Sequence, residues 1–297
     1  MKKSVFFFDQ ITIIGGGLIG VSLAKIARKN KLVNRIKFYD NSKFVRKRLK
    51  GLKIADEVCE NIQDSVKNSD MTVLAIPVGS MGEVSSSISG YLKKGSIITE
   101  TGSTKLSVIK DIKPNIPKNV WFIPSHPLAG TENSGPDAGF SELFKDKYWI
   151  LLPDNEVPAS ITNKLKDFFA SCGAITETMQ PDYHDKILAI TSHLPHLIAY
   201  TIVGTATDLE EQTKHDVVRF SATGFRDFTR IAASDPIMWR DVFLNNREAV
   251  LEMLQRFNED LSYLQRAIRW SEGEKLENLF TRTMEIRRSI IEEGQDK

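Results

Sequence analysis

The 297-residue sequence predicts an α/β protein in which a doubly wound sheet is followed by an all-helical domain. Up to about residue 180, short β-branched or aromatic segments alternate with helical patterns, as in consecutive βαβ units. After Pro181 no strand pattern is recognisable, and apolar residues recur at spacings of three and four, which indicates helices. The chain is long enough for two compact units. We therefore expect one domain over residues 1–180 and a second over residues 181–297.

Six strands are expected in the first domain. They cover residues 10–15, 35–40, 71–76, 96–99, 120–124 and 148–152. Their apolar residues are continuous rather than alternating, which is typical of parallel strands covered by helices on both faces. Ligand sites are then expected beyond the carboxyl ends of these strands.

The second domain should contain one helix of about 30 residues, judged by the length of its apolar stripe. Asp235 can cap the start of this helix, and Pro236 can occupy its first turn. The stripe comprises Val242, Phe243, Val250, Met253, Leu254, Phe257, Leu261, Leu264 and Ile268. A helix this long exposes more apolar surface than a small domain covers, so the sequence predicts a homodimer formed through the helical half.

Composition argues against several kinds of partner. The formal net charge is +2, so no overall basic field exists to attract nucleic acid or a membrane surface. Cys59 and Cys172 form no CxxC pair, so neither a disulfide framework nor a zinc site is indicated. No apolar run reaches the roughly 20 residues of a membrane helix, and the apolar segment that ends at Asp9 is too short for a signal peptide. We expect a cytoplasmic protein with a small-molecule substrate.

A glycine-rich turn follows the first expected strand and opens a helix. Gly15 allows the tight turn, Gly17 lets the backbone approach a pyrophosphate, and Gly20 lets helix and strand pack closely. Leu18 and Ile19 stand in the first helical turn, whose N–H groups would face the anion. In this context the G-x-G-x-x-G pattern predicts a Rossmann-type dinucleotide site, with a strand–helix turn that binds no ligand as the alternative.

Asp40 ends the second expected strand, 20 residues after Gly20. An acidic side chain at this position hydrogen-bonds the adenosine ribose and repels a 2′-phosphate, so NAD is favoured over NADP. Lys43 and Arg46 lie close enough to leave NADP open, and Asp40 could instead only solvate the strand end. The other cofactor contacts expected at strand ends are Ile76, Pro77 and Thr101.

Two polar segments, residues 100–105 and 125–132, follow the next strands and should face the same cleft. His126 in the second segment is the candidate catalytic base. A neutral imidazole can accept a hydroxyl proton while hydride leaves the same carbon for NAD, and its unperturbed pKa of about 6.5 suits that role. Taken alone, a loop histidine is more often a structural hydrogen-bonding residue.

Four ordered segments resemble the prephenate and arogenate dehydrogenases of tyrosine biosynthesis, and the resemblance covers nearly the whole chain. The segments are Thr101–Lys105, His126–Glu132, Ser192–His196, and Gly224–Ala232 leading into Ser234–Trp239. The resemblance implies oxidative decarboxylation of prephenate to 4-hydroxyphenylpyruvate with reduction of NAD. His126 would then take the C4 hydroxyl proton. Arogenate as substrate, a β-hydroxyacid-type dehydrogenase and a dinucleotide-sensing regulator are the alternatives.

The resemblance also implies roles for further residues. Ser103 is similar to the serine that hydrogen-bonds the substrate hydroxyl and orients the histidine, although it could also cap the helix before Lys105. Arg230 matches the family position that binds a substrate carboxylate, for which a bidentate guanidinium is suited. Its alternative is a surface ion pair. The remaining substrate contacts implied are His193, His196, Thr131, Glu132 and Trp239.

His193 and His196 are three residues apart, so a helix would place both rings on one face. Pro195 between them is expected to kink that helix. Two histidines could suggest a metal site, but no third ligand is apparent, so no metal is predicted.

Overall fold

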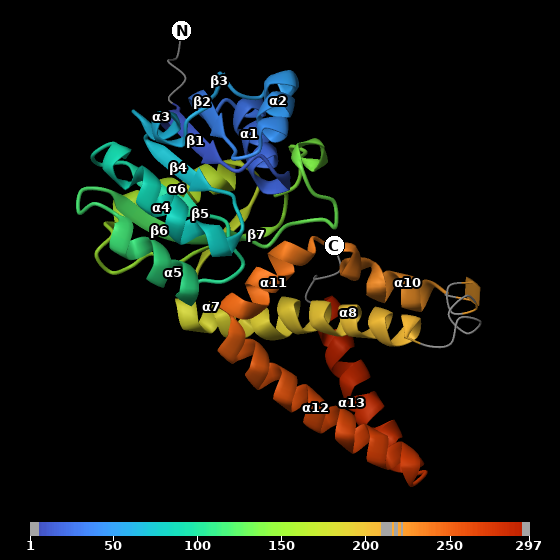
Figure 1. Ribbon diagram of the computed structural model, residues 1–297. Coiled ribbons are helices and arrows are strands. Elements are labelled where there is room, and N and C mark those ends of the chain that lie inside the picture. Colours follow the sequence, from blue (N-terminus) through green and yellow to red (C-terminus); the bar gives the residue numbers. More distant parts are fainter. Residues whose placement is uncertain (1–5, 209–215, 217–218, 221, 293–297) are drawn as a thin grey trace. The chain divides into compact units, whose positions relative to one another are not determined.

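The computed structural model describes residues 6–208, 216, 219–220 and 222–292 (Figure 1). The chain divides into two compact units, Met1–Arg247 and Glu248–Lys297. The first unit contains the sheet, the helices around it and several helices that follow the last strand, while the second unit is helical. The expected domain boundary at residue 180 falls inside the first unit and stays a prediction.

One eight-stranded sheet forms the centre of the first unit, in the order β3-β2-β1-β4-β5-β6-β7-β8. The strands are β1 (Phe8–Ile14), β2 (Val33–Tyr39), β3 (Glu57–Val58), β4 (Met71–Leu74), β5 (Ile97–Glu100), β6 (Trp121–Pro127), β7 (Tyr148–Leu151) and β8 (Ile175–Thr178). All the expected strands are present. The sequence pattern missed β3, which has two residues, and β8, which is mostly exposed and partly polar.

The sheet reverses direction once. Neighbours from β3 across to β6 are parallel, whereas β7 is antiparallel to β6 and places Ile150 opposite His126. β8 is again parallel to β7. The parallel arrangement expected of consecutive βαβ units therefore holds from β3 to β6 and not at the β6–β7 pairing. The buried run from Trp149 to Leu151 is apolar at every position, and such a run does not encode strand direction.

Helices cover both faces of the sheet, as Figure 1 shows. They are α1 (Leu18–Lys29), α2 (Lys43–Leu52), α3 (Ile62–Val66), α4 (Met81–Ile88), α5 (Leu106–Ile112) and α6 (Ala159–Ser171). Buried side chains of α1, α2 and α6 join one apolar core, and those of α3, α4 and α5 join a second. Short helical turns are η1 (Val78–Ser80), η2 (Ser89–Tyr91), η3 (Lys113–Asn115), η4 (Pro136–Ala138) and η6 (Arg230–Ala233). The two cores establish the doubly wound architecture.

The first unit continues after β8 in α7 (Pro181–Leu188), the π-helical turn η5 (Ala189–His193), α8 (Leu194–Thr207), α10 (Thr223–Thr229) and α11 (Pro236–Asn245). Pro195 stands in the first turn of α8, directly after the wider π turn. A proline lacks the N–H that a regular α-helix would use at that position, and the turn before it is π-helical instead. The chain nevertheless stays helical through the Ser192–His196 segment.

The helix Pro181–Thr207 has 27 residues, and its most apolar 18-residue window has a mean hydropathy of 1.4 with 28% buried. By length and composition alone it could cross a membrane, contrary to the sequence expectation. A core helix of a soluble protein passes the same test. The first half of this helix carries charged and imidazole side chains that are described below as part of the candidate site.

The expectation of one continuous helix from Asp235 to residue 268 is wrong. Asp235 caps α11 as predicted, since its Oδ1 accepts the N–H groups of Ile237 and Met238. However, α11 ends at Asn245 and α12 (Arg247–Arg269) starts anew. Asn246 has φ −113° and ψ 32°, and its side chain bonds groups on another helix, which competes with helical geometry. The second unit consists of α12 and α13 (Gly273–Glu292), and α13 was not expected.

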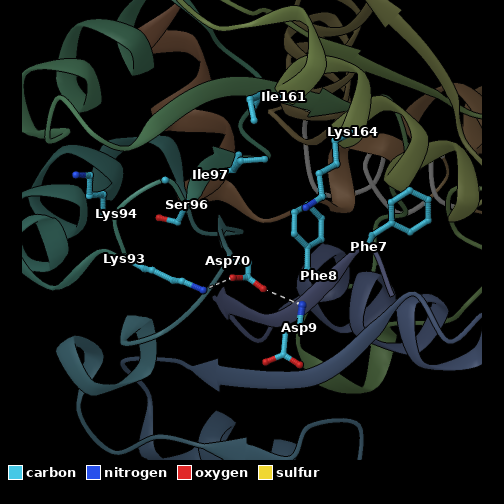
Figure 2. Close-up of a pocket in the computed structure, with 11 residues that line it drawn as sticks. Phe7, Phe8, Asp9, Asp70, Lys93, Lys94, Ser96, Ile97, Ile161 and Lys164 are labelled. Carbon is cyan, nitrogen blue, oxygen red and sulfur yellow. Dashed lines mark hydrogen bonds and ion pairs between the residues drawn. The ribbon is translucent and has the colours of Figure 1, made fainter. Parts of the chain in front are cut away.

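A cavity of about 370 Å³ lies at the amino-terminal edge of the sheet (Figure 2). Phe8 and Asp9 line it at the start of β1, and Ser96 lines it just before β5. The Asp70 carboxylate accepts the Asp9 N–H at 2.8 Å and pairs with Lys93 Nζ at 2.6 Å. Ligands of doubly wound sheets bind at the opposite edge, so this cavity lies away from the candidate site.

Candidate active site

Two glycines of the 15–20 turn are required by packing. Gly15 has φ +108°, and a Cβ there would collide with the carbonyl oxygen of Ala75 and lie 2.9 Å from Ile76 Cγ2. A Cβ on Gly20 would collide with the carbonyl oxygen of Gly15. Only glycine fits either position without a shift of backbone. The end of β1, the start of α1 and the end of β4 are therefore packed against one another.

Gly17 differs from these two glycines because a Cβ there would meet nothing within 4 Å. It stands just before α1, and no side chain caps that helix. Leu18 and Ile19 form the first turn and are half-buried. The first N–H groups of a helix have no partner within the helix, so this open end is suited to a phosphate group. The geometry fits the dinucleotide site predicted from the sequence.

Asp40 is tied directly to the glycine turn. Its Oδ2 accepts the Gly16 N–H at 2.8 Å, and its Oδ1 accepts the Ser42 N–H at 2.8 Å. Arg46, which the sequence left as a possible phosphate partner, is buried and already engaged. Its Nη1 donates to the Asp40 carbonyl at 2.7 Å, and its Nη2 lies 3.0 Å from Glu60 Oε2. Its guanidinium is therefore held by protein groups.

The remaining expected cofactor contacts lie at the same edge of the sheet. Ile76 and Pro77 follow β4, and Thr101 follows β5. The Thr101 N–H donates to the carbonyl of Leu74 at 3.1 Å, which keeps the two strand ends adjacent. The structure thus brings these residues beside the glycine turn, and their contact with a cofactor stays a prediction.

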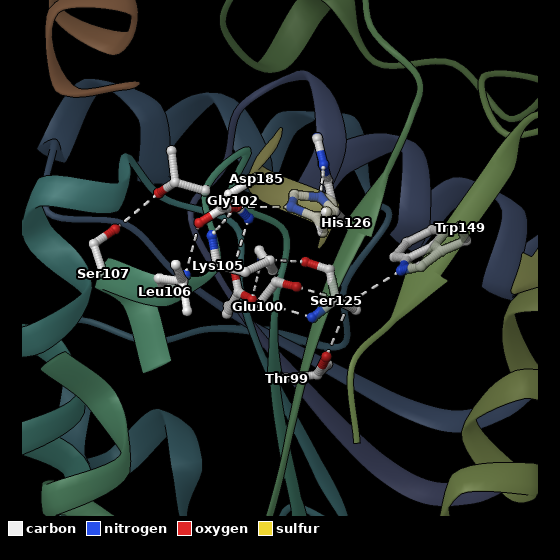
Figure 3. A network of polar contacts seen from close by, with 12 residues as sticks. Thr99, Glu100, Gly102, Lys105, Leu106, Ser107, Ser125, His126, Trp149 and Asp185 are labelled. Carbon is white, nitrogen blue, oxygen red and sulfur yellow. Dashed lines mark hydrogen bonds and ion pairs between the residues drawn. The ribbon is translucent and has the colours of Figure 1, made fainter. Parts of the chain in front are cut away.

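A fully buried ion pair lies under this edge (Figure 3). Lys105 Nζ pairs with Glu100 Oε1, and both side chains have no exposed surface. Lys105 Nζ also donates to the carbonyl of Ser125 at 2.6 Å, and Glu100 accepts the N–H groups of Gly102 at 2.6 Å and Ser125 at 3.1 Å. Burial raises the pKa of Glu100 and lowers the pKa of Lys105, while their mutual attraction opposes both shifts. The pair fastens the 100–105 turn to β6 beside His126.

Ser125 strengthens the same junction through its hydroxyl. Ser125 Oγ donates to the Glu100 carbonyl at 2.7 Å and lies 3.0 Å from Thr99 Oγ1. It also accepts the indole N–H of Trp149 at 3.0 Å. Strands β5, β6 and β7 are therefore cross-linked at the residue that precedes His126 (Figure 3).

His126 is buried in β6, with 7% of its surface exposed, and joins a chain of polar contacts. Its Nδ1 lies 2.9 Å from Nε2 of His184, whose Nδ1 lies 2.8 Å from Asp185 Oδ1. The Asp185 carboxylate also accepts the backbone N–H groups of Lys105 at 2.8 Å and Leu106 at 2.9 Å. Burial, followed by the neighbouring His184 and Lys105, lowers the pKa of His126 well below 6.5. The imidazole is therefore neutral at neutral pH and can act as a base.

Ser103 lies half-buried in the turn that carries Lys105. It is not a helix cap, because α5 begins at Leu106, its N-cap residue is Lys105, and the first N–H of the helix is accepted by Asp185. Its hydroxyl has no hydrogen-bond partner among the residues that the structure describes, and His126 is held by His184 instead. The orienting contact expected from Ser103 to His126 is therefore not seen, while a contact from Ser103 to a substrate hydroxyl stays a prediction.

His193 and Trp239 each bury a polar nitrogen that has no partner in the described part of the chain. Asn246 Nδ2 donates to the Asp185 carbonyl at 2.8 Å and lies 3.1 Å from His193 Nδ1. An amide nitrogen only donates, so the His193 proton sits on Nε2. Desolvation by burial lowers the pKa of His193 to about 4. His193 Nε2–H and Trp239 Nε1–H are thus two unpaired donors, and unpaired buried donors call for an acceptor.

His196 stacks on Trp239, with ring centroids 3.6 Å apart and an interplanar angle of 24°. Its Nδ1 lies 2.8 Å from the carbonyl of Ser192, so the neutral ring keeps its lone pair on Nε2. Desolvation lowers the pKa of His196, and the charge of Arg230 lowers it further. The segments that carry His193, His196 and Trp239 therefore meet.

Arg230 and Glu132 form a partly exposed ion pair, with Nη1 2.8 Å from Oε2. Thr131 is exposed, and its Oγ1 accepts the N–H of Asn133 at 3.2 Å. The loop that follows β6 is thereby connected to the helical turn η6, which begins at Arg230. Both hypotheses for Arg230, a surface ion pair and a carboxylate ligand, are compatible with this position.

Comparison with known families identifies the arrangement. Residues 23–178 match the family model for the nucleotide-binding domain of prephenate dehydrogenase, and residues 180–282 match the model for its dimerization domain. The chain belongs to the prephenate dehydrogenase family. It is therefore a dehydrogenase with a doubly wound nucleotide-binding domain, and the resemblance predicted from four short segments is confirmed.

Relatives match over most of their length. The cyclohexadienyl dehydrogenase of Zymomonas mobilis is 42% identical over 95% of this chain and 96% of its own. The prephenate dehydrogenase of Bacillus subtilis is 32% identical over 92% of this chain and 72% of its own. Among solved structures, prephenate dehydrogenase from Aquifex aeolicus in complex with hydroxyphenyl propionate and NAD+ superposes with a TM-score of 0.87. It is 32% identical and covers 97% of this chain and 100% of its own.

The sequence did not reveal the roles of several polar residues that surround His126 and His193 in this chain. They are Glu100, Lys105, His184, Asp185 and Asn246. The only signal for His184 and Asp185 was an adjacent His-Asp pair just after the proline that opens α7. No group of three or more His, Cys, Asp or Glu side chains suited to a metal occurs among the described residues.

Proposed function

We propose that this chain catalyses the NAD-dependent oxidative decarboxylation of prephenate to 4-hydroxyphenylpyruvate. The observation that carries the proposal is the buried, neutral imidazole of His126 at the sheet edge that also holds the glycine turn. Membership of the family supports dehydrogenase chemistry. Arogenate is the second candidate substrate, because the Zymomonas mobilis relative has the broader name cyclohexadienyl dehydrogenase.

The cofactor proposed is NAD, which when bound supplies the hydride acceptor. Gly17 and the first turn of α1 would hold its pyrophosphate, and Asp40 would bond the adenosine ribose. The carboxylate of Asp40 repels a 2′-phosphate, and Arg46 is engaged by a carbonyl and Glu60. These contacts favour NAD over NADP.

In the proposed reaction the substrate loses hydride from ring C4 and the proton from the C4 hydroxyl. His126 accepts that proton, and Ser103 would hydrogen-bond the same hydroxyl and align it. The bond between ring C1 and its carboxylate breaks, carbon dioxide leaves, and the released electron pair completes the aromatic ring as a phenolate. The phenolate oxygen takes the proton back from His126, which gives the phenol and restores the base. Aromatisation makes the overall step favourable.

Prephenate is a dicarboxylate, and the chain offers donors for it. We assign Arg230 to a substrate carboxylate, because a guanidinium forms two parallel hydrogen bonds to such a group. The unpaired N–H groups of His193 and Trp239 are suited to further substrate oxygens. His196, Thr131 and Glu132 are proposed to border the same pocket.

We also propose a homodimer formed through the helical half, which matches the dimerization-domain model of the family. The helices of this half, and the turn that follows α12, expose large apolar side chains that a second copy would cover. They include Ile202, Leu251, Leu261, Ile268, Trp270, Phe280 and Ile286. Sedimentation at micromolar concentration should show a dimer, and a monomer there would count against the proposal. A cytoplasmic location stays a prediction.

One assay tests the reaction. Pure protein is mixed with NAD and either prephenate or arogenate, and NADH absorbance is followed while the product is identified by mass. The proposal expects NADH and 4-hydroxyphenylpyruvate in equal amounts from prephenate. If NADH formed with arogenate but not with prephenate, the substrate would be arogenate. No NADH from either compound would overturn the proposed function.

A further inference from the structure

We infer that Asp185 and His184 are positioning residues that fix the tautomer of His126, so that the lone pair of His126 sits on Nε2. The inference rests on the proposed function, in which His126 is the base. It follows from three consecutive hydrogen bonds, drawn in part in Figure 3, that run from the start of α5 through α7 to β6. A base needs its lone pair on the nitrogen that faces the substrate, and a neutral imidazole offers only one.

The first step concerns Asp185, which meets donors on both carboxylate oxygens. Oδ1 accepts the Lys105 N–H at 2.8 Å, and Oδ2 accepts the Leu106 N–H at 2.9 Å. His184 Nδ1 lies 2.8 Å from the same Oδ1. A carboxylate only accepts hydrogen bonds, so His184 Nδ1 carries a proton.

The second step passes this constraint to His126. Desolvation lowers the pKa of His184, so its ring is neutral and its Nε2 holds a lone pair. That Nε2 lies 2.9 Å from His126 Nδ1, which must therefore be the donor. The second nitrogen of His126, Nε2, is left with the lone pair and has no protein hydrogen bond in the described part of the chain. The same contacts persist when His126 takes up a proton, because the imidazolium still donates from Nδ1.

A purely structural role for Asp185 is the competing explanation. Its carboxylate meets the N–H groups at the start of α5 as a helix cap from another segment would, and loss of a cap costs stability. A useful test therefore reads the tautomer itself. Nitrogen-15 shifts of the imidazole rings distinguish protonated from unprotonated Nδ1 and Nε2, and single substitutions of each histidine assign the signals.

The main variant is Asp185→Asn, with Asp182→Asn as the matched control. Asp182 lies exposed on the same helix α7 and takes no part in the chain of contacts. An amide at position 185 can donate to His184 Nδ1, which reverses both tautomers and moves the His126 proton to Nε2. We expect kcat to fall by roughly 10² to 10⁴, as it does when the carboxylate behind a catalytic histidine is lost, with KM and NAD affinity within about twofold. Asp182→Asn should change none of these.

A second pair of variants keeps the test decisive if Asp185→Asn folds poorly. His184→Gln retains an amide oxygen that can accept the His126 Nδ1–H, whereas His184→Leu cannot accept a hydrogen bond. We expect His184→Gln to keep kcat within about tenfold of the natural protein and His184→Leu to lose roughly 10² or more.

Two results would overturn the inference. The first is a set of nitrogen-15 shifts showing that His126 of the natural protein carries its proton on Nε2. The second is normal turnover in His184→Leu. A kcat loss in Asp185→Asn with an unchanged His126 tautomer would likewise reduce Asp185 to a helix cap. Failure of the proposed function is a separate outcome, since the natural protein would then form no NADH from prephenate whatever tautomer His126 shows.

Discussion

Arg230 and Glu132 are 98 residues apart in the sequence, yet Nη1 of the arginine lies 2.8 Å from Oε2 of the glutamate. Their side chains are 58% and 33% exposed. Exposed ion pairs add little to folding stability, so this contact does not explain Arg230 as a structural residue. A guanidinium held loosely by one carboxylate can exchange it for another, which is what binding a carboxylate substrate requires.

Replacing Arg230 by alanine should therefore raise KM for prephenate by roughly 10- to 100-fold, the worth of one charge-assisted hydrogen bond, with a smaller effect on kcat. NAD affinity and Tm should stay near those of the natural protein. Arg240→Ala is the control, because that guanidinium pairs with the adjacent Asp241 on α11. If Arg230→Ala weakened NAD and prephenate equally, its role would be structural.

Gly17→Ala and Gly20→Ala form a second matched pair. A Cβ at Gly20 would strike the backbone of Gly15, so that variant should unfold at lower temperature. A Cβ at Gly17 meets open space at φ −83°, so Gly17→Ala should keep its Tm but bind NAD at least tenfold more weakly. Calorimetry and NAD titration check both. Unchanged NAD affinity in Gly17→Ala would show that the turn holds no pyrophosphate.

Lys105→Met should destabilise the fold, because it leaves the Glu100 carboxylate buried without its partner. The expected loss in the free energy of unfolding is about 3–5 kcal/mol. Adding Glu100→Gln to the same chain should recover much of it, since the uncompensated charge disappears. Urea denaturation of the single and double variants measures this coupling. If the free energy of unfolding of Lys105→Met lay within about 1 kcal/mol of that of the natural protein, the ion pair would contribute little to stability.

The sequence predicted those features that depend on local pattern. The glycine turn and Asp40 could be found because a tight turn and a strand end leave a residue signature, and strands with continuous apolar runs could be placed. Asn246 could not be recognised as a helix break, because its side chain is held by the Asp185 carbonyl on another helix. The roles of His184 and Lys105 could not be recognised either. His184 bonds His126, which is 58 residues away in the sequence. Lys105 pairs with the nearby Glu100, but a lysine is usually exposed, so its burial could not be read from the sequence.

The stability of the protein should decrease in mild acid. His193 has its pKa lowered to about 4, whereas the unfolded chain binds a proton there near pH 6.5. The unfolded state therefore holds more protons between these values, and the free energy of unfolding falls as pH drops from 6.5 to 4. This residue accounts for up to roughly 3 kcal/mol of the fall.

Urea denaturation between pH 4 and 7.5 should show that fall in the natural protein and a shallower one in His193→Gln. His126 and His184 also have lowered pKa values and act in the same direction, so some pH dependence should remain in the variant. Parallel curves for the two proteins would mean that His193 is not buried as a neutral ring.

The turnover of His126→Asn tests the central claim most directly. The asparagine amide can still donate to His184 Nε2, as His126 Nδ1 does, but it removes the nitrogen that would accept the substrate proton. We predict that kcat for prephenate falls by roughly 10² to 10⁴ while NAD affinity and Tm change little. Near-normal turnover in this variant would contradict the assignment of His126 as the catalytic base.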